Sequence, residues 1–131
     1  MRAALILATI VAVHTAAAKP PGPAITLTPA QAASLGAHIV QPEYPFEARR
    51  RGISGHGVFL IEAEIATGAV HRVCTQRSTG SAILDQSVLR ALRQWRFNPA
   101  TFRSLQRRYA PDETEKYTRI VVPVRFTLRN A

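Results

Sequence analysis

The sequence predicts a small α+β domain, in which two helices pack on one face of a three-stranded antiparallel sheet. The first observation is the order of the local patterns along the chain, which is helix, hairpin, helix, strand. The second is the length of 131 residues, which allows one domain. The third is the composition: 47% hydrophobic and 19% charged residues are typical of a globular chain and not of a disordered one.

The N-terminus resembles an export signal. Arg2 gives a positive start, residues 3–13 form an apolar run, and residues 16–18 are three alanines, which suit a cleavage site. We therefore predict a signal peptide over residues 1–18. The alternative is an uncleaved anchor in the inner membrane, although the apolar run is shorter than the ~20 residues that span a bilayer.

The next segment, residues 19–41, reads as a lead-in to the domain. Four prolines among small residues favour an extended or loosely ordered chain, with a short helical turn over residues 29–35. We expect the folded domain to cover residues 42–131.

A short helix and a hairpin open the domain. Pro45 suits the first turn of a helix, and Gly52 suits its end. Residues 56–65 and 69–77 are both rich in strand-forming residues, and only a short connection containing glycine separates them. This spacing predicts an antiparallel hairpin.

A second helix follows Ser81, which is a suitable N-cap. Leu84, Val88, Leu92 and Trp95 recur at helical spacing and predict one buried stripe, which makes Trp95 a core residue before a partner anchor. Gln86, Arg90, Arg93 and Gln94 then lie on the solvated side. We expect the helix to end at Asn98-Pro99 and residues 100–117 to form a long polar loop.

The last strand is predicted over residues 120–128, where apolar residues alternate with others. Pro123 interrupts this run, and proline is confined to sheet edges or bulges because it lacks the N–H of a central ladder. We therefore expect an edge strand. Because an edge strand offers unpaired backbone groups to another chain, partner binding follows as a hypothesis.

The landmarks of the chain resemble those of the TonB C-terminal domain family in order and spacing. Gln41-Pro42-Glu43-Tyr44-Pro45 is similar to the family's Q-P-x-Y-P opening. Further matches follow over the stretch that runs to Leu128: Gly52-Ile53-Ser54-Gly55 with Val58, Gly68-Ala69-Val70, Ser78-Thr79-Gly80, Leu84-Asp85 with Leu89, Trp95-Arg96-Phe97-x-Pro99, and Val122-Pro123-Val124-Arg125-Phe126.

The resemblance implies a periplasmic binding module associated with TonB-dependent transport, which takes an extended peptide of an outer-membrane receptor or another envelope protein as an added strand. It places partner-binding residues in the opening motif and in the last strand: Gln41, Pro42, Tyr44 and Pro45, and Arg119, Ile120, Val121, Val122, Pro123, Val124, Arg125 and Phe126. Full transducers in the family have a membrane anchor and a long proline-rich spacer. A cleaved signal and a lead-in of 23 residues differ from both.

The residues that carry chemistry show no catalytic or metal-binding arrangement. The four histidines and the single cysteine, Cys74, have no ligand spacing, so we expect no metal, no cofactor and no enzymatic activity. Glu62 and Glu64 lie on one strand face, where a solvated surface explains them better than acid–base work. We expect Cys74 to be a buried small hydrophobe, with cross-linking of two chains as the alternative.

The net charge of +9 implies anionic surroundings. The basic clusters are residues 49–51 and the arginines at 103, 107 and 108. Export argues against a nucleic-acid partner. The alternative to peptide binding is therefore a self-associating envelope protein, a homodimer through the edge strand, whose basic face holds an anionic membrane surface or peptidoglycan.

Overall fold

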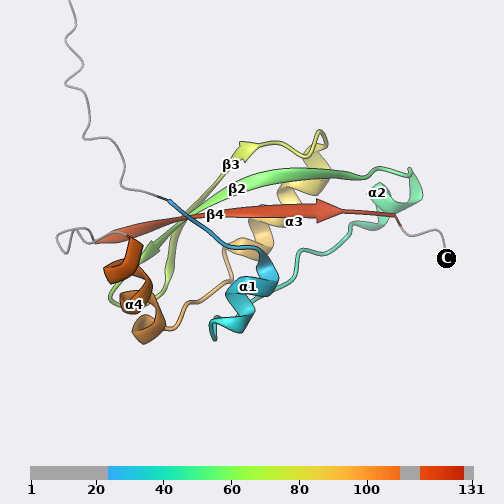
Figure 1. Cartoon of the computed structure of the whole chain (residues 1–131). Coiled ribbons are helices and arrows are strands. Elements are labelled where there is room, and N and C mark those ends of the chain that lie inside the picture. The colour runs from blue at the N-terminus through green and yellow to red at the C-terminus, as the bar shows by residue number, and fades with distance from the viewer. Residues whose placement is uncertain (1–23, 110–115, 129–131) are drawn as a thin grey trace, which may run out of the picture.

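The computed structural model of the chain describes residues 24–109 and 116–128. These residues form four helices and a four-stranded sheet in the order β1-β4-β2-β3 (Figure 1). The predicted α+β class is confirmed, but the sheet has four strands rather than three and is mixed, because Ile25–Thr26 (β1) pairs in parallel with β4. The signal peptide expected over residues 1–18 lies outside the described residues.

The centre of the sheet is the predicted hairpin joined to the predicted last strand. Gly55–Glu64 (β2) pairs antiparallel with Val70–Arg77 (β3) on one side and with Tyr117–Phe126 (β4) on the other. Alternation along β2 and β4 places every second side chain on one face of the sheet. Five of these side chains are fully buried: Phe59, Ile61, Ala63, Ile120 and Val122.

The helices cover that face of the sheet. Pro29–Ser34 (α1), Phe46–Arg50 (α2) and Ala82–Leu92 (α3) are short amphipathic segments. Five of their buried residues belong to the same core cluster as the sheet residues: Ala32, Ala48, Leu84, Val88 and Leu92. The helix predicted after Pro45 ends as expected, because Gly52 adopts a φ of 66°.

The prediction of a loop over residues 100–117 is wrong in its first half. Pro99–Tyr109 form a helix, α4, and α3 ends earlier than predicted, at Leu92. The Asn98-Pro99 pair therefore begins a helix instead of ending one. The Asn98 side chain accepts a hydrogen bond from the Ala100 N–H at 3.0 Å, and proline suits a first helical turn. Phe102 fixes α4 to the core at 3% exposure.

The expected lead-in is part of the folded structure from β1 onward. Leu27 and Ala32 are buried in the core cluster, and the Leu27 N–H donates to the Val121 C=O at 2.9 Å. Thr28 caps α1 reciprocally, because its hydroxyl accepts from the Gln31 N–H while the Gln31 side chain accepts from the Thr28 N–H. The helical turn predicted over residues 29–35 is confirmed as α1.

The turn between β3 and α3 is held by Asp85. Its carboxylate accepts hydrogen bonds from the Ser78 hydroxyl, from the Thr79 hydroxyl at 2.6 Å and from the Thr79 N–H at 2.9 Å. Ser81 is the N-cap of α3, as predicted, although its side chain makes no capping bond. Partial burial alone would raise the pKa of Asp85, but the hydrogen bonds from Ser78 and Thr79 outweigh it and lower the pKa below its usual value.

We expect Asp85→Asn to lower the free energy of unfolding by about 1–2 kcal/mol near neutral pH, because it weakens charge-assisted hydrogen bonds. The folded-state pKa of Asp85 is lowered, so its contribution is present above the unfolded pKa of about 4 and is lost as the pH falls through the folded value. Urea unfolding of both chains from pH 7 to pH 3 should show the difference shrinking. Glu47→Gln is the control, since the Glu47–Arg50 pair is exposed. A difference that grows in acid would contradict the assignment.

Candidate functional site

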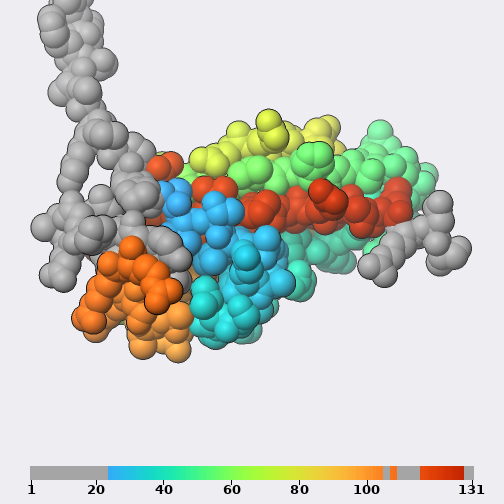
Figure 2. Space-filling model, viewed as in Figure 1, coloured from blue at the N-terminus to red at the C-terminus, as the bar shows by residue number. Residues whose placement is uncertain are grey.

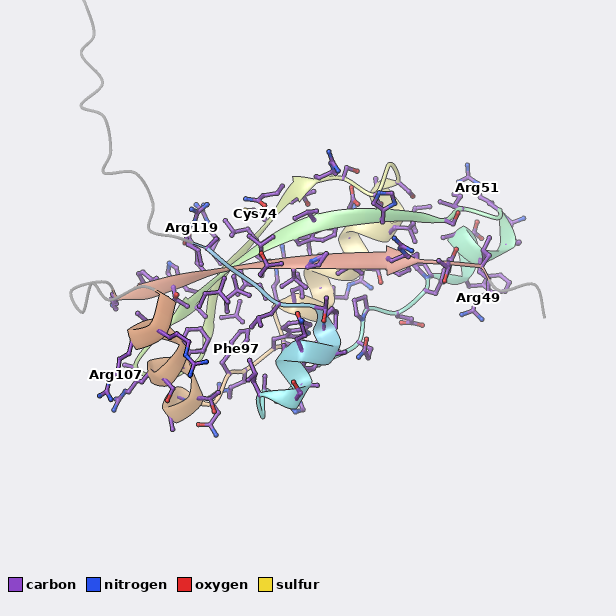
Figure 3. All side chains as sticks on the ribbon, in the orientation of Figure 1. Arg49, Arg51, Cys74, Phe97, Arg107 and Arg119 are labelled. Atoms are coloured by element: carbon purple, nitrogen blue, oxygen red, sulfur yellow. The ribbon has the colours of Figure 1, made fainter. Side chains whose placement is uncertain are left out.

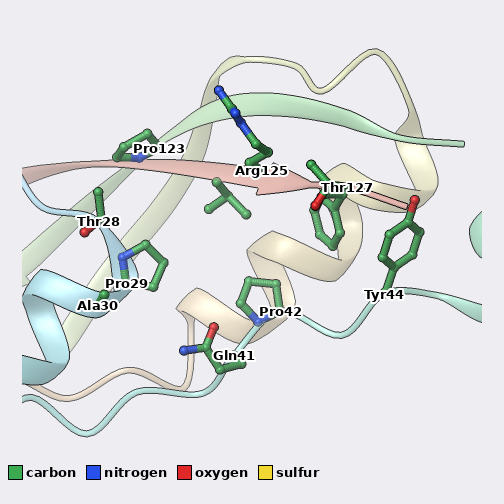
Figure 4. Close-up of a pocket in the computed structure, with 11 residues that line it drawn as sticks. Thr28, Pro29, Ala30, Gln41, Pro42, Tyr44, Pro123, Arg125 and Thr127 are labelled. Carbon is green, nitrogen blue, oxygen red and sulfur yellow. The ribbon is translucent and has the colours of Figure 1, made fainter. Parts of the chain in front are cut away.

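A groove of about 460 Å³ runs beside the free side of β4 (Figure 4). Three separate segments of the chain form it: the start of α1, the segment before α2 and the end of β4. Its lining residues are Thr28, Pro29, Ala30, Gln41, Pro42, Tyr44, Pro123, Val124, Arg125, Phe126 and Thr127. Volumes of this order are typical of ligand sites in proteins.

Among the described residues, nothing pairs with the outward-facing backbone groups of β4 along this groove. Both backbone groups of a strand residue point to the same side, and the side alternates along the strand. Because the Val121 C=O accepts from the N–H of Leu27, the residue after β1, the backbone groups of Pro123 and Arg125 also point away from β2. Pro123 is therefore tolerated, since its missing N–H would have faced outward and not the β2 ladder.

The second wall of the groove, residues 41–44, is fixed against α3 and the residues that follow it. The Trp95 indole N–H donates to the Val40 C=O at 2.9 Å, and the Ser87 hydroxyl donates to the Glu43 C=O. Trp95 is 2% exposed, which confirms its predicted place in the core. Gln41, between these two anchors, is exposed.

Tyr44 belongs to both the core and the groove. Its hydroxyl donates to the Ile53 C=O, and its ring meets the Phe126 ring edge to face at 5.3 Å. The Arg49 guanidinium lies over the same ring at 5.3 Å. These contacts fix an aromatic surface at the α2 end of the groove. A smaller hollow adjoins the groove there, and its lining residues are Tyr44, Arg49, Thr127 and Leu128.

The structure brings most of the sequence-predicted site residues together. Seven of them line the groove: Gln41, Pro42, Tyr44, Pro123, Val124, Arg125 and Phe126. Pro45 instead precedes α2 at its N-cap position, and Arg119, Ile120, Val121 and Val122 lie along β4 before the groove. The prediction of a free edge is wrong at Ile120 and Val121, because β1 pairs with them.

Sequence reasoning missed four lining residues: Thr28, Pro29, Ala30 and Thr127. The readable signal was the pair Thr28 and Gln31, three residues apart with Pro29 between them, which is a capping box before a helix. It predicts where α1 starts. It contains no information on which strand α1 lies beside, since that depends on the tertiary packing.

The remaining candidate residues lie elsewhere on the sheet. Glu62 pairs with Arg72 at 3.4 Å across β2 and β3. Cys74 is half-buried on β3 opposite Leu60, so it is more exposed than the predicted core position. In the described ranges, no cluster of three or more His, Cys, Asp or Glu residues could hold a metal ion.

The basic clusters lie at opposite ends of the molecule. Arg49 and Arg51 lie at the α2 end and Arg107 lies on α4, and all three are exposed (Figure 3). Of these clusters, only the one on α2 adjoins the hollow, through Arg49. None of the helices in the part of the chain that the structure describes has the length and apolar character needed to cross a membrane.

Comparisons with known proteins assign most of the chain to one protein family. Residues 40–128 match the family model of the Gram-negative bacterial TonB protein C-terminal region. The chain is 37% identical over 89 residues to Protein TonB of Vibrio cholerae, covering 68% of this chain and 32% of that protein. It is 36% identical over 63 residues to Protein tonB2 of Pseudomonas aeruginosa, covering 48% of this chain and 23% of the relative.

The fold agrees with this assignment. The solution NMR structure of the Pseudomonas aeruginosa TonB CTD superposes with a TM-score of 0.54 at 21% identity, covering 72% of this chain and 85% of that one. The chain spans about a third or less of the length of the curated relatives it matches. The family match covers both the residues 41–44 wall and the β4 wall of the groove. The chain therefore belongs to the family of Gram-negative bacterial TonB protein C-terminal domains.

Proposed function

We propose that this chain is a periplasmic peptide-binding module, not an enzyme, and that it acts in TonB-dependent transport. Its partner is an extended segment of an outer-membrane receptor or of another envelope protein. The segment lies in the groove beside residues 123–127 and adds to β4 as a further strand. The observation that carries this proposal is the groove along a free strand edge, most of whose lining residues lie in the region that matches the family.

The groove offers two kinds of contact to such a segment. Backbone groups on the free side of β4 can continue the ladder, which gives affinity without reading sequence. Side chains of an added strand alternate between two faces, and one face would rest on Pro42, Tyr44 and Phe126. A partner with an apolar residue at every second position therefore fits best.

The charges near the groove favour a partner without excess positive charge. Arg125 is exposed on β4, and Arg49 lies at the end of the hollow next to Tyr44. The chain as a whole carries a net charge of +9. Approach of neutral or acidic segments is favoured at low salt, and basic segments are repelled.

A second copy of the chain is the rival occupant of the same edge. Two copies would each bring a charge of +9 to the contact, which opposes association. We therefore propose the heterologous peptide as the partner and treat self-association as an outcome of the test.

The test is a calorimetric titration of the purified chain with synthetic peptides from the periplasmic segments of receptors encoded in the same genome. At least one segment should bind saturably, and its affinity should depend on the Arg125 N–H more than on the Arg125 side chain. Sedimentation of the chain alone measures self-association. The proposal fails if no receptor segment binds, or if the chain dimerises through β4 and so closes the groove.

A further inference from the structure

The free side of β4 is divided into two parts. β1 covers the first part, where Ile25 lies opposite Ile120 and Thr26 lies opposite Val121. The second part, residues 123–127, lines the groove. In Figure 2 the blue atoms of β1 and of the start of α1 lie against one end of the red β4, and the rest of this strand remains visible.

The segment that covers the first part is fixed in several ways. A strand of two residues alone contributes little stability. Leu27, however, is only 8% exposed and donates its N–H to Val121, and Ala32 of α1 is fully buried. Displacing β1 and the residues that follow it would therefore expose core side chains. We expect β1 to stay paired with β4 when a partner binds.

The junction between β1 and α1 also ends the ladder. The Thr28 N–H is already bonded to the Gln31 side chain, and the Thr28 C=O accepts from the Ala32 N–H. Pro29 has no N–H to offer. A partner strand that reaches this junction therefore cannot continue its pairing through the backbone groups of Thr28 or through an N–H of Pro29.

We propose that the β1–α1 junction, residues 25–30, is a fixed stop that sets the register and the length of the bound partner. This inference rests on the proposed peptide-binding function. The paired part of the partner lies opposite residues 123–127, a stretch of about 13 Å at roughly 3.3 Å per residue. About five partner residues pair there, and additional residues toward β1 pair with nothing.

The experiment fixes β1 on β4 by a reversible cross-link. Thr26 and Val121 are register neighbours, and both lie outside the groove lining. Thr26→Cys and Val121→Cys, with Cys74→Ser to remove the native thiol, should form a disulfide across the β1–β4 pair. The reduced form of the same protein is the matched control.

The probes are two capped peptides of alternating threonine and valine with an aspartate at each end, five and nine residues long. If the stop is fixed, oxidation changes the Kd by less than about 2-fold, and the longer peptide binds within about 3-fold of the shorter one. In the free chain, the Leu27 amide should exchange slowly with solvent.

Three results would overturn the stop. Oxidation could weaken binding of the nine-residue peptide by about 10-fold or more, which would mean that β1 leaves when the peptide binds. The nine-residue peptide could bind about 10-fold tighter to the reduced form than the five-residue peptide, which would mean that pairing continues past residue 123. The third is that neither peptide binds either form; this would count against the proposed peptide binding itself, and the stop would fall with it.

Discussion

Arg125→Pro is expected to weaken peptide binding by roughly 10- to 100-fold and to leave the fold intact. The Arg125 N–H faces the open side of β4, so a partner C=O would lose its donor and remain unpaired. A buried C=O without a hydrogen-bond donor costs about 1–3 kcal/mol of binding free energy. The fold should tolerate the change, because the Arg125 side chain is exposed and Pro123 already occupies the same outward register.

Arg125→Ala is the matched control for this variant. It removes the charged side chain and keeps the N–H, so the Kd should rise by less than about 3-fold at physiological salt. Titration calorimetry with a receptor peptide measures the affinities, and thermal unfolding checks the fold. Equal binding by the proline variant and the wild type would show that the β4 backbone does not hold the peptide.

Trp95→Ala is expected to lower the free energy of unfolding by about 3–5 kcal/mol, which is the usual cost of removing a large core aromatic. The side chain is 2% exposed and meets the Phe97 ring at 6.2 Å. Its indole N–H also holds the Val40 C=O, next to the groove wall. Loss of Trp95 should therefore loosen residues 41–44 and weaken peptide binding as well.

Two further variants separate the contributions of Trp95. Trp95→Phe keeps most of the ring but removes the N–H, so we expect a smaller loss of about 2 kcal/mol. Phe46→Ala removes an aromatic side chain that is 74% exposed and should change stability by less than about 0.5 kcal/mol. Urea unfolding measures all three. A Trp95→Ala chain as stable as the Phe46→Ala chain would contradict the core assignment.

The sequence was sufficient for the elements whose signal is periodic or local. The alternation around Val122 and Val124 predicted β4, and the helical spacing of Leu84, Val88 and Leu92 predicted α3. Turn chemistry predicted the hairpin and the end of α2 at Gly52. These signals reflect burial and backbone conformation, which neighbouring residues largely determine.

The elements that sequence reasoning misjudged depend on longer-range packing. Asn98-Pro99 suits the start of a helix as well as its end, and only the burial of Phe102 against the core shows that α4 follows. β1 has two residues, too few for any period, and its partner lies about ninety positions away along the chain. Thr28 and Pro29 therefore could not be recognised as part of the groove.

The sequence predicted that β4 has an open side, but not how much of that side is open. Pro123 correctly indicated that one side of β4 lacks a full ladder, since its backbone faces away from β2. It could not indicate how much of that side stays free, because β1 covers Ile120 and Val121. Of the predicted residues on this strand, only those from Pro123 to Phe126 line the groove, and their role in binding stays a prediction.

Amide hydrogen exchange with and without a saturating receptor peptide tests the central claim most directly. The amides of Arg125 and Thr127 should exchange more slowly in the complex, because the Arg125 N–H faces the open side of β4 and Thr127 lines the groove two residues further on. The Val121 amide should not change, since β1 already covers it. Unchanged exchange at Arg125 and Thr127 with bound peptide would contradict strand addition at β4.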